Sequence, residues 1–258
     1  MFKMSAFGAL LAMMTTQASA ADMKLKTDDG VSLAATSYGN GAKGVLLIHG
    51  QDRSRKDWDN FGEKLSLNGF NVLTVDLRGH GASGGELSDE AWPLMVKDVA
   101  AGVAWLHDSG AAHITIIGAE LGANLALNGA AGNDNVNNVV MLSPGLNING
   151  VKVSAALGGY GERPLLLIAD SDDATSARAA GLIADKVVGK KKLELLAGAG
   201  SGVKMLNTDA SVEGMLVGWL NDAYGGASVI KHSQREVRSG EVDADIETSG
   251  TRFGEKQD

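Results

Sequence analysis

The chain has 258 residues, of which 44% are hydrophobic and 21% are charged, and it contains no cysteine. This length is enough for one large domain with a buried core, so a second domain is not required. The formal net charge of −8 argues against a nucleic-acid partner, because binding to phosphates needs clustered Lys and Arg and the basic residues here are scattered. The lack of cysteine excludes disulfides and a thiol nucleophile.

The first twenty residues have the three-part pattern of a secretory signal peptide. Lys3 provides the positive charge, residues 4–14 are apolar, and residues 18–20 have the small side chains of a cleavage site. The apolar run is shorter than the ~20 residues that a membrane-spanning helix needs. We therefore expect residues 1–20 to be removed and the mature chain, with no membrane span, to cross the inner membrane into the periplasm.

The mature chain starts with two segments of alternating hydrophobicity, residues 23–27 and 31–37. Asp28, Asp29 and Gly30 separate them, which is typical of a β-hairpin. Continuous apolar runs follow and predict strands that are buried on both faces: residues 44–48, 70–75, 114–117, 139–142, 165–168 and 193–196. Six such strands indicate a mainly parallel sheet.

Helical patterns alternate with these strands, which predicts a doubly wound α/β fold with helices on both faces of the sheet. One helix is marked by the helical spacing of its apolar residues Met95, Val99, Val103 and Leu106, with Pro93 in its first turn. Only about twenty residues separate the strand that ends near residue 143 from the strand that begins near residue 164. This leaves no room for a helical lid domain.

The composition changes after the domain, which we expect to span residues 21–224. Residues 225–258 are polar, charge-mixed and poor in large apolar side chains, which predicts a flexible tail. The alternation of Val242, Ala244 and Ile246 leaves open an edge strand within this tail.

Two motifs near the start of the domain closely resemble signatures of the α/β-hydrolase superfamily. They are Val-Leu-Leu-Ile-His-Gly at residues 45–50 and Val-Asp-Leu-Arg-Gly-His-Gly-Ala-Ser at residues 75–83. The resemblance implies an α/β-hydrolase fold in which the backbone N–H of Gln51 contributes to an oxyanion hole. It also implies that the Arg-Gly-His-Gly loop is structural, so we expect His49 and His80 to be scaffold residues and not bases.

The central motif is a buried strand that runs into Gly-Ala-Glu-Leu-Gly at residues 118–122 and then into a helix. This is the context of the nucleophile elbow in the same superfamily, where Leu121 would supply the second oxyanion N–H. Glycine is needed at positions 118 and 122 for a steric reason, because side chains there would collide where the strand and the helix approach each other. The frame of the elbow is intact, but Glu120 replaces its serine.

Residues 142–146 and 163–173 resemble lidless serine hydrolases similar to dienelactone hydrolases, a resemblance that extends over most of the mature domain. In that branch the catalytic acid follows the strand that ends near residue 168. Asp173 matches this position best, with Asp172 one residue away. The alternative is that one of these carboxylates caps the helix that begins near Ser176, and one residue could do both.

The resemblance also implies a histidine in a Gly-x-Gly-His-Gly loop after the last strand. Residues 198–202 read Gly-Ala-Gly-Ser-Gly, so Ser201 stands in place of the histidine. The remaining histidines are expected on a helix end, on a strand start and in the tail: His107, His113 and His232. None is placed to act as the base.

Little catalytic chemistry is expected from these substitutions. Glu120 is ionised near neutral pH and needs no base for a first attack, but no histidine would activate the water that releases the product. Alternatively, the Glu120 carboxylate accepts backbone N–H groups at the start of its helix and fills the oxyanion hole. A cation held by Glu120 and Asp173 would have too few ligands, so we predict no metal and no cofactor.

We therefore expect a non-catalytic or nearly inactive family member of serine ester or amide hydrolase ancestry. It would bind a small-molecule ligand or a protein partner, with the pocket over Glu120 as its candidate site. One alternative is an active carboxylic-ester hydrolase with a non-standard base, such as His232 from the tail. Another is a partner-binding protein in which the tail is the functional element.

Overall fold

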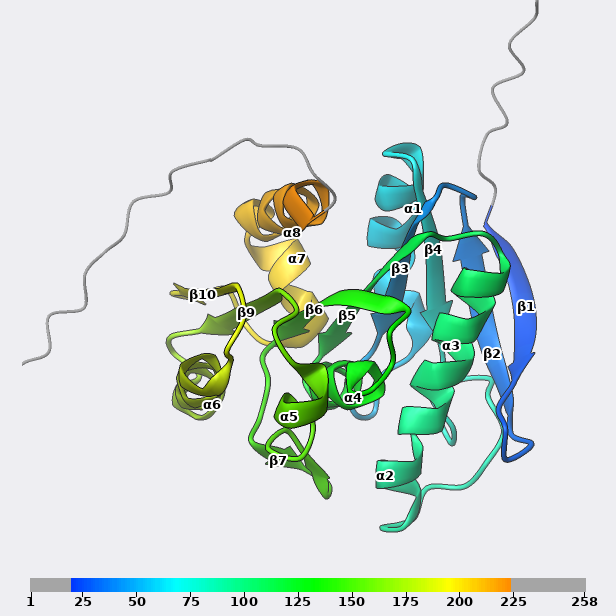
Figure 1. The fold of residues 1–258 in the computed structure, drawn as a ribbon, viewed down its shortest axis with the longest axis horizontal. Helices are drawn as coiled ribbons and strands as arrows, with labels where there is room; N and C mark the ends of the chain where they lie inside the picture. Colours follow the sequence, from blue (N-terminus) through cyan, green and yellow to red (C-terminus); the bar gives the residue numbers. More distant parts are fainter. Residues whose placement is uncertain (1–19, 224–258) are drawn as a thin grey trace, which may run out of the picture. The chain divides into compact units, whose positions relative to one another are not determined.

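The computed structural model describes residues 20–223, which belong to one compact unit (Figure 1). The predicted signal peptide up to residue 19 and the predicted tail from residue 225 lie outside the described residues. No helix in residues 20–223 is long and apolar enough to cross a membrane.

The core of the domain is an eight-stranded sheet with the order β1-β2-β4-β3-β5-β6-β9-β10. The strands are β1 (Ala21–Lys26), β2 (Ser32–Tyr38), β3 (Lys43–Ile48), β4 (Phe70–Val75), β5 (His113–Ala119), β6 (Val136–Leu142), β9 (Leu165–Asp170) and β10 (Lys191–Leu196). β1 and β2 form the predicted antiparallel hairpin, and β2 is antiparallel to β4. The neighbouring pairs from β4 to β10 are parallel, so the predicted fold class is confirmed.

Helices cover both faces of the sheet. They are α1 (Asp59–Leu67), α2 (Ala91–Leu94), α3 (Val96–Asp108), α4 (Leu121–Ala130), α5 (Leu157–Tyr160), α6 (Ala174–Lys186), α7 (Met205–Thr208) and α8 (Ala210–Ala223), with 3-10 turns η1 (Arg55–Trp58) and η2 (Gly202–Lys204). α3, α4 and α6 lie on one face, and α1 and α8 lie on the other (Figure 1). Each face therefore has its own apolar core.

The helix predicted around Met95 begins later than its apolar pattern suggests. Met95, Val99, Val103 and Leu106 are all buried, as expected. Pro93, however, lies in the separate single turn α2, and α3 begins only at Val96. Proline has no N–H to donate and its ring crowds the preceding turn. The helix is therefore interrupted after Pro93, and a new helix begins at Val96.

The segment between β6 and β9 carries no lid domain. It holds a two-stranded hairpin of β7 (Asn147–Ile148) and β8 (Val151–Lys152), followed by the single-turn helix α5. Within residues 20–223, this segment therefore places no separate domain over the loops that follow the parallel strands. In sheets of this kind the carboxyl ends of the strands share one edge, which is where ligands bind.

Candidate functional site

Glu120 lies in a tight turn between β5 and α4, with a φ of 53°. Left-handed backbone of this kind is uncommon for a residue other than glycine and marks a strained position. The predicted role of the two flanking glycines is confirmed by the space around them. A Cβ on Gly118 would overlap the carbonyl oxygen of Gly122, and one on Gly122 would overlap that of His49.

The Glu120 side chain points away from α4 and reaches across to the loop that follows β10. Its Oε1 accepts a hydrogen bond of 2.8 Å from the Ser201 hydroxyl. A Cβ on Gly50 would overlap Oε2, and one on Gly202 would lie 3.0 Å from Oε1. The carboxylate therefore occupies space that two glycines leave open.

The expectation that the Glu120 carboxylate caps its own helix is wrong. Glu120 is the N-cap residue of α4, but its side chain makes no capping hydrogen bond. The positive φ turns the side chain out of the helix start, so the carboxylate meets Ser201 and not the N–H groups of α4.

The loop between β10 and η2 is held by Asp170, a residue that sequence reasoning missed. Its Oδ1 accepts from the N–H of Gly198 at 3.2 Å and its Oδ2 from that of Gly200 at 2.5 Å. The N–H of Asp172 also donates to Oδ1, at 2.9 Å. Hydrogen bonds from the N–H groups of Asp172 and Gly200 hold the pKa of the Asp170 carboxyl below its ordinary value.

A second contact fixes the far end of the same loop. The N–H of Gly202 donates to Oγ of Ser143, just after β6, at 2.9 Å. Ser143 follows a buried strand and lies in the segment 142–146 that resembles lidless serine hydrolases, but sequence reasoning assigned it no role. Ser201 is thus held between two anchored glycines, Gly200 and Gly202, facing Glu120.

The two aspartates that the sequence left as alternatives face different partners. Asp173 is the N-cap of α6, and its Oδ1 accepts from the N–H of Ser176 at 3.1 Å. Oδ2 of Asp172 accepts from the N–H of Gly198 at 3.1 Å. The capping alternative for Asp173 is therefore observed, and of these two aspartates it is Asp172 that contacts the Gly198–Gly202 loop, beside Asp170.

The two predicted oxyanion-hole residues flank the turn at Glu120. Gln51 follows Gly50 in the turn after β3, and Leu121 is the first residue of α4. The Gln51 side chain accepts a hydrogen bond of 2.8 Å from Asn149, which lies between β7 and β8. Within residues 20–223, the backbone N–H of neither residue donates to a loop carbonyl or a side chain. Their role in an oxyanion hole stays a prediction.

His49 is buried and both of its ring nitrogens contact the backbone. Nδ1 lies 2.7 Å from the carbonyl oxygen of Gly50, and Nε2 accepts from the N–H of Leu77 at 3.0 Å. These partners fix the tautomer with the proton on Nδ1. Burial lowers the pKa of His49 to about 4. A neutral ring with no free nitrogen matches a scaffold residue and not a base.

No imidazole among residues 20–223 hydrogen-bonds to Glu120 or Ser201. His80 contacts the Arg78 carbonyl oxygen through Nδ1 at 3.0 Å. His107 lies near the end of α3 and His113 starts β5, at the edge of the sheet opposite to Glu120. His232, the alternative base, lies outside the described residues.

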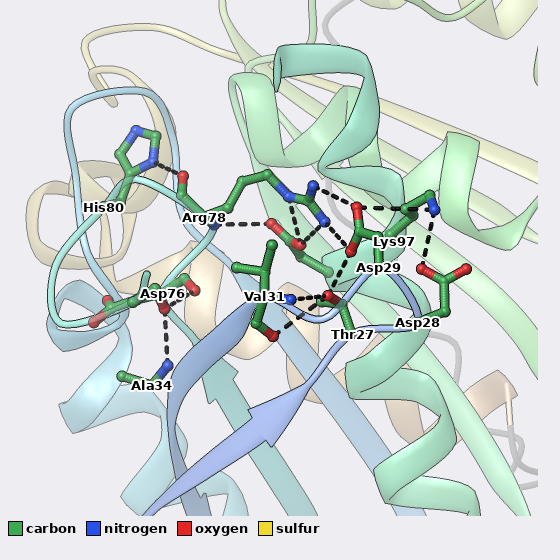
Figure 2. A network of polar contacts seen from close by, with 11 residues as sticks. Thr27, Asp28, Asp29, Val31, Ala34, Asp76, Arg78, His80 and Lys97 are labelled. Atoms are coloured by element: carbon green, nitrogen blue, oxygen red, sulfur yellow. Dashed lines mark hydrogen bonds and ion pairs between the residues drawn. The ribbon is translucent and has the colours of Figure 1, made fainter. Parts of the chain in front are cut away.

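Arg78 makes the loop after β4 rigid by binding two carboxylates (Figure 2). Its guanidinium donates to Asp98 at 2.7 and 2.9 Å and to Asp29 at 2.8 and 3.1 Å. The bonds from Arg78 hold the pKa of Asp29 well below its ordinary value. Asp98 is fully buried, and loss of solvation raises its pKa despite the same partner. This loop joins the hairpin to α3 and serves as scaffold.

A cavity of about 100 Å³ opens over Glu120. It is lined by Gly50, Arg53, Ala119, Glu120, Ser201, Val203 and Lys204. Its polar groups are thus one carboxylate, one hydroxyl and two cationic side chains, of which Arg53 also pairs with Asp57 at 2.6 Å. Sequence reasoning missed Arg53 and Lys204, because nothing in their local pattern separates them from other surface cations.

A larger hollow of about 340 Å³ lies at the opposite edge of the sheet, where β5 and β6 begin. It is lined by His107, Gly110, Ala111, Ala112, Asp134, Asn135 and Asn137. We place the candidate site at the smaller cavity, because polar groups from three separate loops converge there. Residues 20–223 contain no group of three or more His, Asp or Glu side chains that could hold a metal ion.

Comparisons with known proteins give the same fold. The family model described as serine aminopeptidase, S33, matches residues 40–162. An esterase of Pyrococcus furiosus is similar over 86% of this chain and 97% of its own, with 22% identity and a TM-score of 0.68. A dienelactone hydrolase of Anabaena variabilis is similar over 80% of this chain and 98% of its own, with 19% identity and a TM-score of 0.68.

A predicted hydrolase of Thermoplasma acidophilum is similar over 79% of this chain and 99% of its own, with 18% identity and a TM-score of 0.63. A search of curated proteins finds no match. The sequence matched by the family model runs from just before β3, through the turn at Glu120, to just before β9. These comparisons show that the chain has the α/β-hydrolase fold, and part of its sequence matches a family model of that fold.

Proposed function

We propose that this protein is a non-catalytic or nearly inactive member of the superfamily, of serine ester or amide hydrolase ancestry, that binds a small polar ligand over Glu120. The observation that carries the proposal is the 2.8 Å hydrogen bond from Ser201 to Glu120. It joins the two residues that the sequence resemblance matches to the nucleophile and histidine positions, and neither residue is the one that acyl transfer requires.

The chemistry of the pair supports this proposal. A serine hydrolase removes a proton from its hydroxyl with an imidazole whose pKa lies near the working pH. Glu120 could attack an electrophile directly, but release of the resulting ester needs an activated water, and no described imidazole reaches the site. Turnover is therefore absent or very slow.

The lining of the cavity indicates which ligands fit. About 100 Å³ holds only a few non-hydrogen atoms, since a water molecule in the liquid takes roughly 30 Å³. The Glu120 carboxylate accepts one hydrogen bond within residues 20–223 and forms no ion pair there. A ligand that brings an ammonium or amide N–H to this carboxylate, and a negative group to Arg53 or Lys204, would satisfy both charges.

We also propose that the remaining family roles fall on Asp172 and on two backbone N–H groups. Asp172 contacts the loop that carries Ser201, whereas Asp173 is engaged at the start of α6. This favours Asp172 over Asp173 as the acid-equivalent residue. The N–H groups of Gln51 and Leu121 would form the oxyanion hole, where they could receive a negative ligand group.

We propose further that the protein works outside the cytoplasm, in the periplasm. The support is the signal-peptide pattern of residues 1–20. A small-molecule ligand and a protein partner both remain compatible with the site in this compartment, and we favour the small ligand because the cavity is narrow.

A second candidate function follows from the same contact. Ser201 already donates its proton toward Glu120, so Ser201 could act as a nucleophile with Glu120 as the non-standard base. The Ser201 oxygen would bond to an ester carbonyl carbon, and Glu120 would take the proton and pass it to the departing alcohol. Water would then release the acid by the same route. This would be a carboxylic-ester hydrolase in which the nucleophile and the base have exchanged positions.

Labelling of the purified protein by a fluorophosphonate probe separates the two candidates. We expect no labelled serine, because a carboxylate is a weak base for a hydroxyl. Stoichiometric labelling of Ser201 that is lost in Glu120→Gln would contradict the non-catalytic proposal and support the exchanged pair. Ser201→Ala is the matched control for probe attached elsewhere.

Ligand binding is tested independently by calorimetry with glycine amide, ethylammonium and acetate. We expect an N–H-bearing probe to bind the wild-type protein at least tenfold more tightly than Glu120→Gln. Equal binding by both proteins would show that Glu120 does not contribute to ligand binding.

A further inference from the structure

The outer edge of β10 carries unpaired backbone groups. β10 is the last strand of the sheet, next to β9, and no other described strand pairs with it (Figure 1). An open edge is a template for pairing with another strand, and proteins usually protect it with charges, bulges or covering segments. The described residues give β10 a regular register with β9 and no bulge.

Apolar side chains accompany this open edge. Leu193 and Leu195 are 36% and 46% exposed, and Val188, in the connection that leads to β10, is 80% exposed. Leu193 and Leu195 share one face of the strand, because side chains alternate along it. Exposed leucines on consecutive positions of one face suit a surface that becomes covered.

The backbone of β10 shows which groups face outward. The carbonyl oxygens of Lys190 and Leu196 accept from the N–H groups of Leu165 and Ser171 on the β9 side. In a parallel pair, alternate residues direct both their N–H and C=O toward the neighbour. The even-numbered residues of β10 therefore face β9, and Leu193 directs its N–H and C=O outward.

We propose that β10 pairs antiparallel with β10 of a second copy of this chain, with the two-fold axis at Leu193. The two Leu193 residues would then exchange both backbone hydrogen bonds. Lys192 would lie opposite Glu194 of the second copy, and the reverse pair would form on the other side of the axis. These are pairs without backbone hydrogen bonds, whose side chains come closest in an antiparallel ladder.

The charges of β10 select this register. Lys192 and Glu194 already contact each other within the strand at 2.9 Å, so two copies would join four alternating charges. A shift by two residues in one direction would place Lys192 opposite Lys192, and a shift in the other direction would place Glu194 opposite Glu194. Like charges in opposite positions are destabilising. Lys191, which could guard the edge, would lie opposite Leu195 and not opposite another lysine.

Analytical ultracentrifugation of the purified full chain tests the proposal through charge reversal. We expect a concentration-dependent dimer for the wild-type protein. Lys192→Glu and Glu194→Lys should each weaken it by roughly tenfold, because two attractive pairs become two repulsive ones. A 1:1 mixture of the two variants should regain wild-type association, because opposite charges then face each other in both pairs.

Lys24→Glu is the matched control, because it reverses an exposed charge on β1, the other edge strand of the sheet. It should leave the association constant unchanged. Thermal midpoints establish that each variant is folded. A wild-type protein that stays monomeric at about 200 μM, single variants that associate like the wild type, or a mixture without recovery would each overturn the proposal.

Discussion

The Ser201 hydroxyl and the Glu120 carboxylate meet at 2.8 Å although 81 residues separate them along the chain. The contact joins the turn after β5 to the loop after β10. Because Ser201 is the one described hydrogen-bond partner of this carboxylate within residues 20–223, the pair has a stability that can be measured directly.

A double-mutant cycle with Glu120→Ala and Ser201→Ala should give a coupling free energy of about 1 kcal/mol in urea unfolding. The value reflects a hydrogen bond to a charged acceptor at a half-buried site. Additive effects of the two substitutions would mean that the contact does not persist in solution.

Reversal of the two substitutions should restore hydrolysis. In Glu120→Ser combined with Ser201→His, the new serine would lie in the strained turn after β5. The new imidazole would lie in the anchored loop after β10. We expect hydrolysis of an activated aryl ester at least ~100-fold above either single variant, because members of a triad act as a unit. A folded double variant without activity would show that the surrounding groups no longer support the chemistry.

The same restored variant decides which aspartate orients the imidazole. Added Asp172→Asn should remove most of the activity, and added Asp173→Asn should leave most of it, because Asp173 is committed to the N–H of Ser176. Asp173→Asn also serves as a conservative control, since asparagine caps a helix about as well as aspartate. The opposite result would indicate that Asp173, and not Asp172, orients the imidazole.

Asp170→Asn should loosen the loop that carries Ser201. The lowered pKa of Asp170 shows that its charged form is the one that the loop N–H groups bind. We expect faster amide hydrogen exchange at Gly198 and Gly200 in Asp170→Asn than in the wild type. Asp209→Asn, which removes another carboxylate with a lowered pKa at a separate turn, should leave these two amides unchanged.

His49 should make the fold sensitive to mild acid. Its pKa is about 4 in the folded protein against 6.5 ordinarily, so the unfolded chain binds this proton first as the pH falls. The contribution is fully present above pH 6.5 and is lost toward pH 4, by roughly 3 kcal/mol in the free energy of unfolding. Urea unfolding between pH 7 and pH 4 measures it, and His49→Asn should flatten the curve over that interval.

The sequence was sufficient for the strand positions because most strands are short continuous apolar runs, such as residues 44–48 and 165–168. A strand with one face in solvent would alternate apolar and polar residues, so an unbroken run indicates burial on both faces. The prediction that residues 193–196 form a strand buried on both faces is wrong in its burial, because β10 is an edge strand in which Leu193 and Leu195 are 36% and 46% exposed. The sequence was not sufficient for the break between α2 and α3, because Met95 continues the apolar spacing of the helix although the chain restarts after Pro93. The hairpin of β7 and β8 was missed because two-residue strands carry no periodic signal.

The candidate site was predictable where glycines mark its frame, at residues 118–122 and 198–202. It was not predictable where side-chain direction decides, as in the run that contains Asp170, Asp172 and Asp173. These three carboxylates are close in sequence, yet each contacts a different set of N–H groups. Their directions depend on where β9 ends and where α6 begins, which composition and spacing do not give.

Gly50 and Gly202 also limit which substitutions can be combined with Glu120. A methyl group at residue 50 would overlap the Glu120 carboxylate, and one at residue 202 would press on it at 3.0 Å. With glutamate at position 120, a side chain at residue 50 therefore requires the carboxylate to move, which would disturb its hydrogen bond to Ser201. The effect of a mutation at residue 50 thus depends on the residue at 120, whereas the positive φ of 58° disfavours a side chain at residue 202 whatever stands at 120.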